Sequence, residues 1–225
     1  MRRLGIGCAD GILVSLLKKL HILGNSRFGD RLKSWDVLKT VRFLSERLVY
    51  KDPILDLGAY ASEILPVLKH TGFTALTGID LNPDLMNMPD TTGIKYVIGN
   101  FYESGLPAES FLAVTAISVI EHGFDCQRLL SEISRILITE GYFIASFDYW
   151  PDKIDTRGIK AFDLDWNIFS SEEVQKLLDE ALRLGLVPVG NLDFTAANAP
   201  IVWMGKSYTF AWIVLQKKNP YVQQP

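Results

Sequence analysis

The spacing of apolar positions changes along the chain, and each spacing predicts a different element. Residues 31–49 carry apolar side chains three or four positions apart with charged residues between them, which is typical of an amphipathic helix. Another helix is predicted at residues 11–23. The period then shortens, because "PILDLG" at residues 53–58 is a short apolar run without a polar face, as a buried parallel strand requires.

Strands and helices alternate through the rest of the chain. Ser62 is expected to cap the helix after the first strand, because Pro66 is tolerated only near a helix start. Ser170 or Ser171 is expected to cap a later helix. The predicted helices are residues 61–70, 125–141 and 170–185, and the predicted strands are residues 53–58, 73–81, 94–100, a part of 110–123, 142–150, 187–194 and 208–217.

This alternation predicts an α/β fold class. We expect a Rossmann-like, doubly wound and mostly parallel seven-stranded sheet, with a C-terminal antiparallel hairpin and an N-terminal helical cap. The two late strands would form the hairpin at one edge of the sheet. The predicted divisions are a helical cap at residues 1–50, a main domain at 51–218 and a loose tail at 219–225.

The composition excludes some classes of binding partner but says little about the fold. The 225 residues are 48% hydrophobic with a net charge of -3, so the chain can bury a full core but has no basic excess for nucleic acid. Cys8 and Cys126 indicate neither a disulfide framework nor a zinc site, which favours a cytoplasmic location. The apolar run at the N-terminus is interrupted by Asp10 and too short to span a bilayer, so we interpret it as an amphipathic helix. A weak membrane-surface contact is the alternative.

A glycine loop follows the first strand, with Gly58 in the first glycine position and Tyr60 and Ser62 where two further glycines would stand. Asp80 ends the next strand about twenty residues later, where a carboxylate can accept bonds from ribose hydroxyls. Together these features favour an adenosine-type nucleotide over a turn glycine and a helix-capping acid. A dinucleotide needs close backbone approach to its pyrophosphate, whereas S-adenosylmethionine has no phosphate and tolerates Tyr60.

Five segments carry a resemblance to a known family: "ILDLGAYAS", "LTGIDLNP", "VIGNFYESGLPAESF", "AISVIEHG" and "EISRILITEGYFIASF". With them the sequence resembles the class I S-adenosylmethionine-dependent methyltransferases, in particular the small-molecule "type 11" group. The resemblance makes S-adenosyl-L-methionine the expected cofactor and residues 51–218 the methyltransferase domain.

The resemblance also implies roles for single residues. Asp56 and Gly58 would shape the pocket for the methionyl part, and Asp80 would bind the ribose. The remaining cofactor-binding candidates are Tyr60, Leu81, Ser118 beyond the fourth strand, and Asn100 with Phe101 beside the adenine.

Three positions depart from the family pattern. Asn100 stands where an aspartate often contacts the adenine amine, although its amide oxygen can accept that bond. Leu112 replaces an aspartate, and Glu140 replaces the first glycine of a common Gly-Gly turn. With the altered glycine loop, these changes keep open a methyltransferase-like domain that serves as a scaffold without catalysis.

His122 is the first candidate for the chemistry. Methyl transfer is an in-line displacement, so the enzyme positions the acceptor and, for a hydroxyl, removes its proton. The imidazole of His122, beyond the fourth strand, is suited to general base catalysis because imidazoles titrate near neutral pH. Positioning of the cofactor or capping of the next helix is the alternative, and Glu121 either orients the imidazole or is solvated.

Asp148 is the second catalytic candidate, at the start of an acidic and aromatic segment, residues 148–155. This segment could line an acceptor pocket for a polyol or sugar, hold magnesium, or be a solvated loop. We predict no metal site. The acceptor is expected to be a small molecule or glycan, with no nucleic acid partner, no integral membrane segment and a possible homodimer.

The sequence thus favours an S-adenosylmethionine-dependent methyltransferase acting on oxygen of a small molecule or glycan. The alternatives are N-methylation of a small metabolite and the non-catalytic scaffold. A nicotinamide oxidoreductase ranks last, because the dinucleotide loop is missing.

Overall fold

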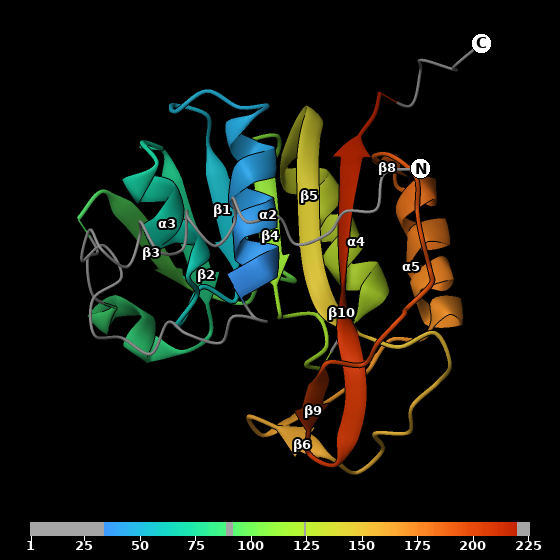
Figure 1. Ribbon diagram of the computed structural model, residues 1–225. Helices are drawn as coiled ribbons and strands as arrows, with labels where there is room; N and C mark the ends of the chain where they lie inside the picture. The colour runs from blue at the N-terminus through green and yellow to red at the C-terminus, as the bar shows by residue number, and fades with distance from the viewer. Residues whose placement is uncertain (1–33, 89–91, 124, 220–225) are drawn as a thin grey trace. The chain divides into compact units, whose positions relative to one another are not determined.

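A mixed sheet runs through the centre of the fold (Figure 1). The structure is a computed structural model, and it describes residues 34–88, 92–123 and 125–219. The strands of the sheet are β1 (Ile54–Leu57), β2 (Leu76–Asp80), β3 (Ile94–Ile98), β4 (Phe111–Ile117), β5 (Leu137–Tyr149), β8 (Leu186–Pro188), β9 (Ile201–Trp203) and β10 (Lys206–Lys217).

The strand order is β3-β2-β1-β4-β5-β10-β8, and β9 joins the sheet by pairing with β10. Strands β1 to β5 are parallel, and β10 is antiparallel to β5, β8 and β9. A separate two-stranded ribbon is formed by β6 (Lys160–Ala161) and β7 (Leu164–Asp165). The predicted doubly wound and mostly parallel sheet is confirmed, with eight strands instead of seven.

Helices cover both faces of this sheet. On one face, α2 (Ser34–Ser45) and α3 (Ile64–His70) pack in one apolar cluster with β1, β4, β5 and β10. On the other face, α4 (Cys126–Ile136) and α5 (Ser171–Arg183) pack in a second cluster with the same strands. A short 3₁₀ helix, η1 (Pro83–Asn87), follows β2.

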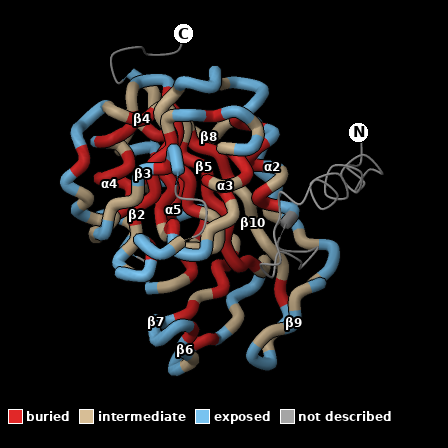
Figure 2. Tube along the Cα trace, turned by 90° about the vertical axis from the view of Figure 1, so that its left-hand side faces the viewer, coloured by how far each residue is buried: buried red, intermediate tan, exposed pale blue. Residues whose placement is uncertain are grey.

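Successive residues of the central strands belong to opposite clusters. Ile54 and Ile144 pack with α2 and α3, whereas Leu55, Leu57 and Phe143 pack with α4 and α5. Figure 2 shows the resulting buried centre, with exposed positions confined mainly to the loops. A strand buried on both faces reads as a continuous apolar run, which explains why β1 has no polar face.

The C-terminal part differs from its prediction in detail. The two late strands do pair antiparallel, as β8 with β10, but β8 ends at Pro188. The β9–β10 hairpin and the β6–β7 ribbon were not predicted, because two- and three-residue strands have no readable periodicity. The predicted helix at 11–23, Cys8 and the tail beyond Asn219 lie outside the described residues, and the predicted division at residue 50 stays a prediction.

Two helix caps can be compared with their predictions. Ser170 caps α5 as predicted, in a reciprocal capping box with Glu173. Helix α3 begins one residue later than expected, because Glu63 and not Ser62 occupies the N-cap position. The Ser62 hydroxyl nevertheless accepts a hydrogen bond of 3.3 Å from the Ile64 amide, so it satisfies one donor of the first turn.

The predicted end of the next helix at Gly141 was wrong. Helix α4 ends at Ile136, and Leu137 already pairs with Phe111 as the first residue of β5. The register of the β4–β5 pair then shifts, so that Gly141 lies in an irregular part of β5. A Cβ at Gly141 would lie 2.8 Å from the Ile138 carbonyl oxygen. Glycine is therefore needed here because the backbone passes close to this position, and not because a helix ends here.

Glu140 stands in this irregular segment with φ of 69°, a left-handed conformation that costs a side-chain-bearing residue about 1 kcal/mol. Glu140→Gly should therefore raise the free energy of unfolding by about 0.5–1 kcal/mol, measured by urea unfolding. Glu140→Ala is the control, because it removes the exposed ion pair with Lys218 but keeps the strain. Equal stability of the glycine and alanine variants would contradict backbone strain at this position.

Candidate functional site

The carboxyl ends of β1, β2 and β4 lie at one edge of the sheet, because these strands are parallel neighbours. Gly58 follows β1, Asp80 ends β2 and Ser118 follows β4. The Tyr60 amide donates a hydrogen bond of 3.0 Å to Asp80 Oδ2, which joins the first two loops. The candidate residues of the first two motifs are thus neighbours in space.

Gly58 is required by its surroundings. Its φ is 66°, and a Cβ built on it would lie 2.6 Å from the Val119 Cγ2 atom. Backbone conformation and space therefore both select glycine. We expected this glycine to leave room for a ligand, and the structure adds that it leaves room for the loop after β4.

The two replaced glycines are a different case. Neither Tyr60 nor Ser62 has a positive φ, so the backbone does not need glycine at either position. The left-handed residue of this stretch is Ala61, with φ of 59°. The loop therefore keeps the one glycine that its conformation and packing demand.

The Asp80 carboxylate accepts hydrogen bonds from two backbone amides. Its Oδ2 accepts from Tyr60, and its Oδ1 accepts from the Asn82 amide at 2.8 Å. A carboxylate has about four acceptor positions, so two remain for hydroxyl donors such as those of a ribose. Leu81, the next residue, exposes 63% of its surface beside this acid and offers an apolar contact to a ligand.

Asp56 is buried in the middle of β1, on the face that carries α2 and α3. The Thr115 hydroxyl donates a hydrogen bond of 2.6 Å to Asp56 Oδ1. Burial raises the pKa of Asp56 to about 7, the nearby Asp80 carboxylate adds to the rise, and the hydroxyls of Ser62 and Thr115 oppose it. Within the described residues Asp56 Oδ2 makes no hydrogen bond, so a buried acceptor is left for another donor.

Asn100 and Phe101 follow β3. Asn100 Oδ1 accepts a hydrogen bond of 2.9 Å from the Tyr102 amide and keeps a second lone pair for a ligand. The Phe101 ring lies 4.8 Å from the Tyr102 ring, centroid to centroid. The Tyr102 hydroxyl donates to the Gly123 carbonyl oxygen at 3.0 Å, so this aromatic pair connects the loops after β3 and β4.

The loop after β4 pairs with the segment that precedes α5. The Gly123 amide donates to the Asp165 carbonyl oxygen at 2.9 Å, and His122 faces Trp166 in an antiparallel bridge. The His122 ring is half-buried and meets Phe162 edge-on, with 5.4 Å between the centroids. This pairing fixes His122 at the rim where the β4 strand ends, and no sequence pattern indicated it.

Asp148 lies inside β5, where we expected the beginning of an acidic loop. It is 4% exposed, and Trp166 Nε1 donates a hydrogen bond of 2.7 Å to its Oδ2. The pKa of Tyr208 is raised by burial, by the neighbouring Asp148 carboxylate and by the Glu121 carboxylate. Two buried acids therefore lie close to one tyrosine at the ends of β4 and β5.

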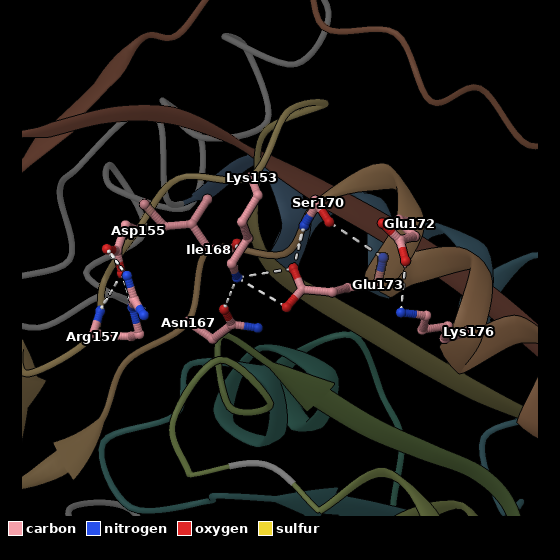
Figure 3. Close-up of polar contacts among 9 residues, drawn as sticks. All are labelled: Lys153, Asp155, Arg157, Asn167, Ile168, Ser170, Glu172, Glu173 and Lys176. Atoms are coloured by element: carbon pink, nitrogen blue, oxygen red, sulfur yellow. Dashed lines mark hydrogen bonds and ion pairs between the residues drawn. The ribbon is translucent and has the colours of Figure 1, made fainter.

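A cavity of about 580 Å³ is lined mainly by residues of the segment that connects β5 to α5 along the chain, including the rest of the predicted acceptor segment. Lys153 Nζ donates to Asn167 Oδ1 at 2.5 Å and to both Glu173 carboxylate oxygens at 2.9 Å (Figure 3). These contacts fasten the segment to the first turn of α5. The cavity is lined by Lys153, Asp155, Thr156, Arg157, Gly158, Ile159, Asp165, Trp166, Asn167 and Glu173.

The carboxylate of Asp155, which we considered as a magnesium ligand, is paired with Arg157. The two groups are 2.8 Å apart, and hydrogen bonding from Arg157 holds the pKa of Asp155 well below its usual value (Figure 3). The described residues contain no group of three or more His, Cys, Asp and Glu side chains placed to hold a metal ion.

Sequence reasoning missed Thr115 and Val119. It considered Trp166 as a residue that closes over the acceptor segment or anchors the next helix, but not its bond to Asp148. Thr115 gave a usable signal, since it is a lone polar residue inside an apolar strand. Val119 and Trp166 act through contacts with residues distant in the chain, Gly58 and Asp148, which no local pattern reveals.

Part of the chain, including most of the candidate site, matches the model of a known protein family. The family model described as a methyltransferase domain matches residues 55–145, which include β1 to β4, α4 and most of β5. Residues 55–145 are therefore similar to a methyltransferase domain. No curated protein matches this chain.

Solved structures share the fold of this chain. An S-adenosylmethionine-dependent methyltransferase from Mesorhizobium loti aligns with a TM-score of 0.59 and 16% identity, over 82% of this chain and 99% of that one. The Burkholderia thailandensis 1,6-didemethyltoxoflavin-N1-methyltransferase, with bound 1,6-didemethyltoxoflavin and S-adenosylhomocysteine, aligns with a TM-score of 0.60 and 18% identity. The alignment covers 94% of this chain and 89% of that one. The Streptomyces coelicolor geranyl diphosphate C-methyltransferase, in complex with Mg²⁺, geranyl diphosphate and S-adenosyl-L-homocysteine, aligns with a TM-score of 0.59 and 14% identity. The alignment covers 86% of each chain.

A helix needs about 20 mostly apolar residues to cross a bilayer. In the part of the chain that the structure describes, no helix combines the length and apolar character needed to cross a membrane.

Asp56 should give the protein a recognisable dependence of stability on pH. Its folded pKa of about 7 lies above the ordinary value of 3.8, so the folded protein holds a proton that the unfolded chain has lost between these values. The wild-type free energy of unfolding should then fall as the pH rises from about 4 to 7, by at most roughly 4 kcal/mol from this group. Above pH 8 the contribution is constant.

Asp56→Asn removes this titration but keeps an acceptor for Thr115. Urea unfolding of both proteins between pH 4.5 and 8.5 should show the variant gaining stability relative to the wild type as the pH rises. Parallel stability profiles would mean that Asp56 does not titrate in this range.

Proposed function

We propose that this domain binds S-adenosyl-L-methionine at the edge formed by the loops after β1, β2, β3 and β4, and transfers its methyl group to a small acceptor. The observation that carries the proposal is the buried Asp56 carboxylate with an unbonded oxygen, two residues before a glycine that packing requires. A buried carboxylate without full hydrogen bonding is costly, and a cationic or hydrogen-bond-donating ligand would compensate it.

The residues at this edge fit the parts of that cofactor. Asp56 and Gly58 would take the methionyl part, with its ammonium group, and the open acceptor positions of Asp80 would take the ribose hydroxyls. Leu81, Asn100 and Phe101 would surround the adenine. Ser118 and Tyr60 would line the pocket from the loops after β4 and β1.

The bound cofactor supplies a methyl group on a positively charged sulfur, which makes that carbon an acceptor of electron pairs. The protein then has to orient the acceptor in line and exclude water. For a hydroxyl acceptor, His122 would remove the proton as general base. Its half-buried position at the end of β4 supports this role. Asp148 would help to shape the acceptor side through its bond to Trp166.

O-methylation of a small molecule or glycan is the first reading of the acceptor. N-methylation of an amine is the second candidate, because the buried acids Glu121 and Asp148 both act on Tyr208 at the same rim. Negative charge at this place attracts a cationic amine. Solved relatives in fold include an enzyme named as an N1-methyltransferase and another named as a C-methyltransferase, so the fold accommodates different acceptors.

Calorimetric titration with S-adenosylhomocysteine tests the cofactor assignment. The wild type should bind it with micromolar affinity and should not bind NADH. Asp80→Asn should weaken binding about 10- to 100-fold, because a hydrogen bond to a charged acceptor contributes about 1.5–3 kcal/mol. The matched control is Asp84→Asn, the same change on the exposed turn of η1, which should bind like the wild type. Lack of wild-type binding at millimolar concentration would support the non-catalytic scaffold.

His122→Ala separates catalysis from binding. With hydroxyl acceptors, turnover should fall about 100-fold or more, because general base catalysis contributes about 10² to 10⁴. The affinity for S-adenosylhomocysteine should stay within about twofold. Release of S-adenosylhomocysteine with separate panels of phenols, sugars and amines measures both turnover and acceptor class. Unchanged turnover with every active acceptor would remove the base role.

A further inference from the structure

A buried aspartate on α2 is connected to the candidate cofactor site through one serine. Asp36 is 1% exposed, and its Oδ2 accepts a hydrogen bond of 2.6 Å from the hydroxyl of Ser146, which is fully buried in β5. The Ser146 oxygen in turn accepts from the Ser118 amide at 3.2 Å. Helix α2 is therefore connected by side-chain hydrogen bonds to the first residue after β4.

The direction of these bonds matters. A serine hydroxyl has one donor, and here that donor points at Asp36, which leaves the oxygen lone pairs for Ser118. The Ser118 amide also donates to the Ser146 carbonyl oxygen at 3.0 Å, so it is shared between two oxygens of the same residue. Loss of Asp36 would free the hydroxyl to rotate and would weaken the hold on Ser118.

Ser118 needs such a hold because its backbone is strained. Its φ of 54° is left-handed, a conformation that costs a residue with a side chain about 1–2 kcal/mol. The residue that follows is Val119, whose methyl group occupies the space next to Gly58. A relaxed Ser118 turn would move Val119 and with it the packing of the glycine loop.

We propose that Asp36 and Ser146 are positioning residues of the cofactor site: they hold the Ser118 turn so that Val119 keeps the Gly58 loop in its binding conformation. This inference rests on the proposed binding of S-adenosylmethionine. It gives α2 a role beyond covering the sheet, since a helix that precedes every sequence motif of the site contributes to its geometry. Figure 1 shows α2 on the face of the sheet over β1 and β4, where this connection runs.

Thr40 provides a matched control on the same helix. Its hydroxyl oxygen accepts a hydrogen bond of 2.9 Å from Trp212 Nε1 on β10, and the residue is fully buried. Thr40→Val removes this bond at almost constant volume. It should lower stability by about 1 kcal/mol or more, because it leaves the half-buried Trp212 indole without its bond, and Ser146→Ala should lower stability because it leaves the buried Asp36 without its bond. Only Ser146 contacts the Ser118 turn.

The experiment compares affinity for S-adenosylhomocysteine by calorimetry with thermal unfolding of the same samples. Ser146→Ala and Asp36→Ala should weaken binding about 5- to 20-fold. Asp36→Asn, which keeps an oxygen acceptor for the hydroxyl, should restore affinity to within about twofold of the wild type. Thr40→Val should bind like the wild type in spite of its lost stability.

If Ser146→Ala does not fold, Ser146→Cys keeps the volume and a weak hydrogen-bonding thiol, and it should still weaken binding about 2- to 5-fold. Wild-type affinity in every folded variant at Ser146 and Asp36 would overturn the positioning role. So would an equal loss of affinity in Thr40→Val, because that loss would follow stability alone. A wild type that does not bind at all would instead contradict the proposed function.

Discussion

The contact between Gly58 and Val119 is the constraint on which the site depends. A Cβ on Gly58 would lie 2.6 Å from a Val119 methyl group, so the loops after β1 and β4 can meet only if one of them has no side chain. Both loops are held from outside this contact: the Tyr60 amide is fixed by Asp80, and the Ser118 amide is fixed by Ser146. A substitution at any of these neighbours should therefore change the position of the loop at Gly58.

This constraint also explains why a loop with one glycine of three keeps its shape. The positions of Tyr60 and Ser62 have negative φ, so side chains there add no backbone strain. The remaining left-handed position holds alanine, which carries the smallest side chain after glycine. Missing glycines matter for a pyrophosphate that lies against the backbone, and much less for a methionyl group held by a buried acid.

The pattern of apolar runs was enough to predict the parallel sheet, its helices on both faces and the antiparallel pair at the C-terminal end, because strands buried on both faces differ clearly from amphipathic helices. Boundaries were harder. Gly141 was interpreted as a helix end, since glycine is favoured there and in irregular strands alike. Of the candidate site, Gly58 and Asp80 were predicted to serve one nucleotide, from their spacing and their places at the ends of successive strands. The pairing of His122 with Trp166 depends on contacts distant in the chain, which spacing does not encode.

Acidic groups at this edge bear on both the cofactor and the acceptor. Asp56 and Asp80 lie beside the cofactor loops, and Glu121 and Asp148 lie at the ends of β4 and β5. Such a potential favours a cofactor with positive charge on sulfur and nitrogen over one with phosphates.

For the acceptor the same acids act in two opposing ways. If His122 is the general base, nearby negative charge would favour the proton that it takes from a hydroxyl, but it would disfavour the negative charge that develops on the hydroxyl oxygen itself. An amine acceptor develops positive charge on its nitrogen during methylation, which nearby acids stabilise, and it develops no negative charge. The balance therefore depends on which group lies nearer to the acids, and the bond from Trp166 draws Asp148 toward the aromatic side of the rim.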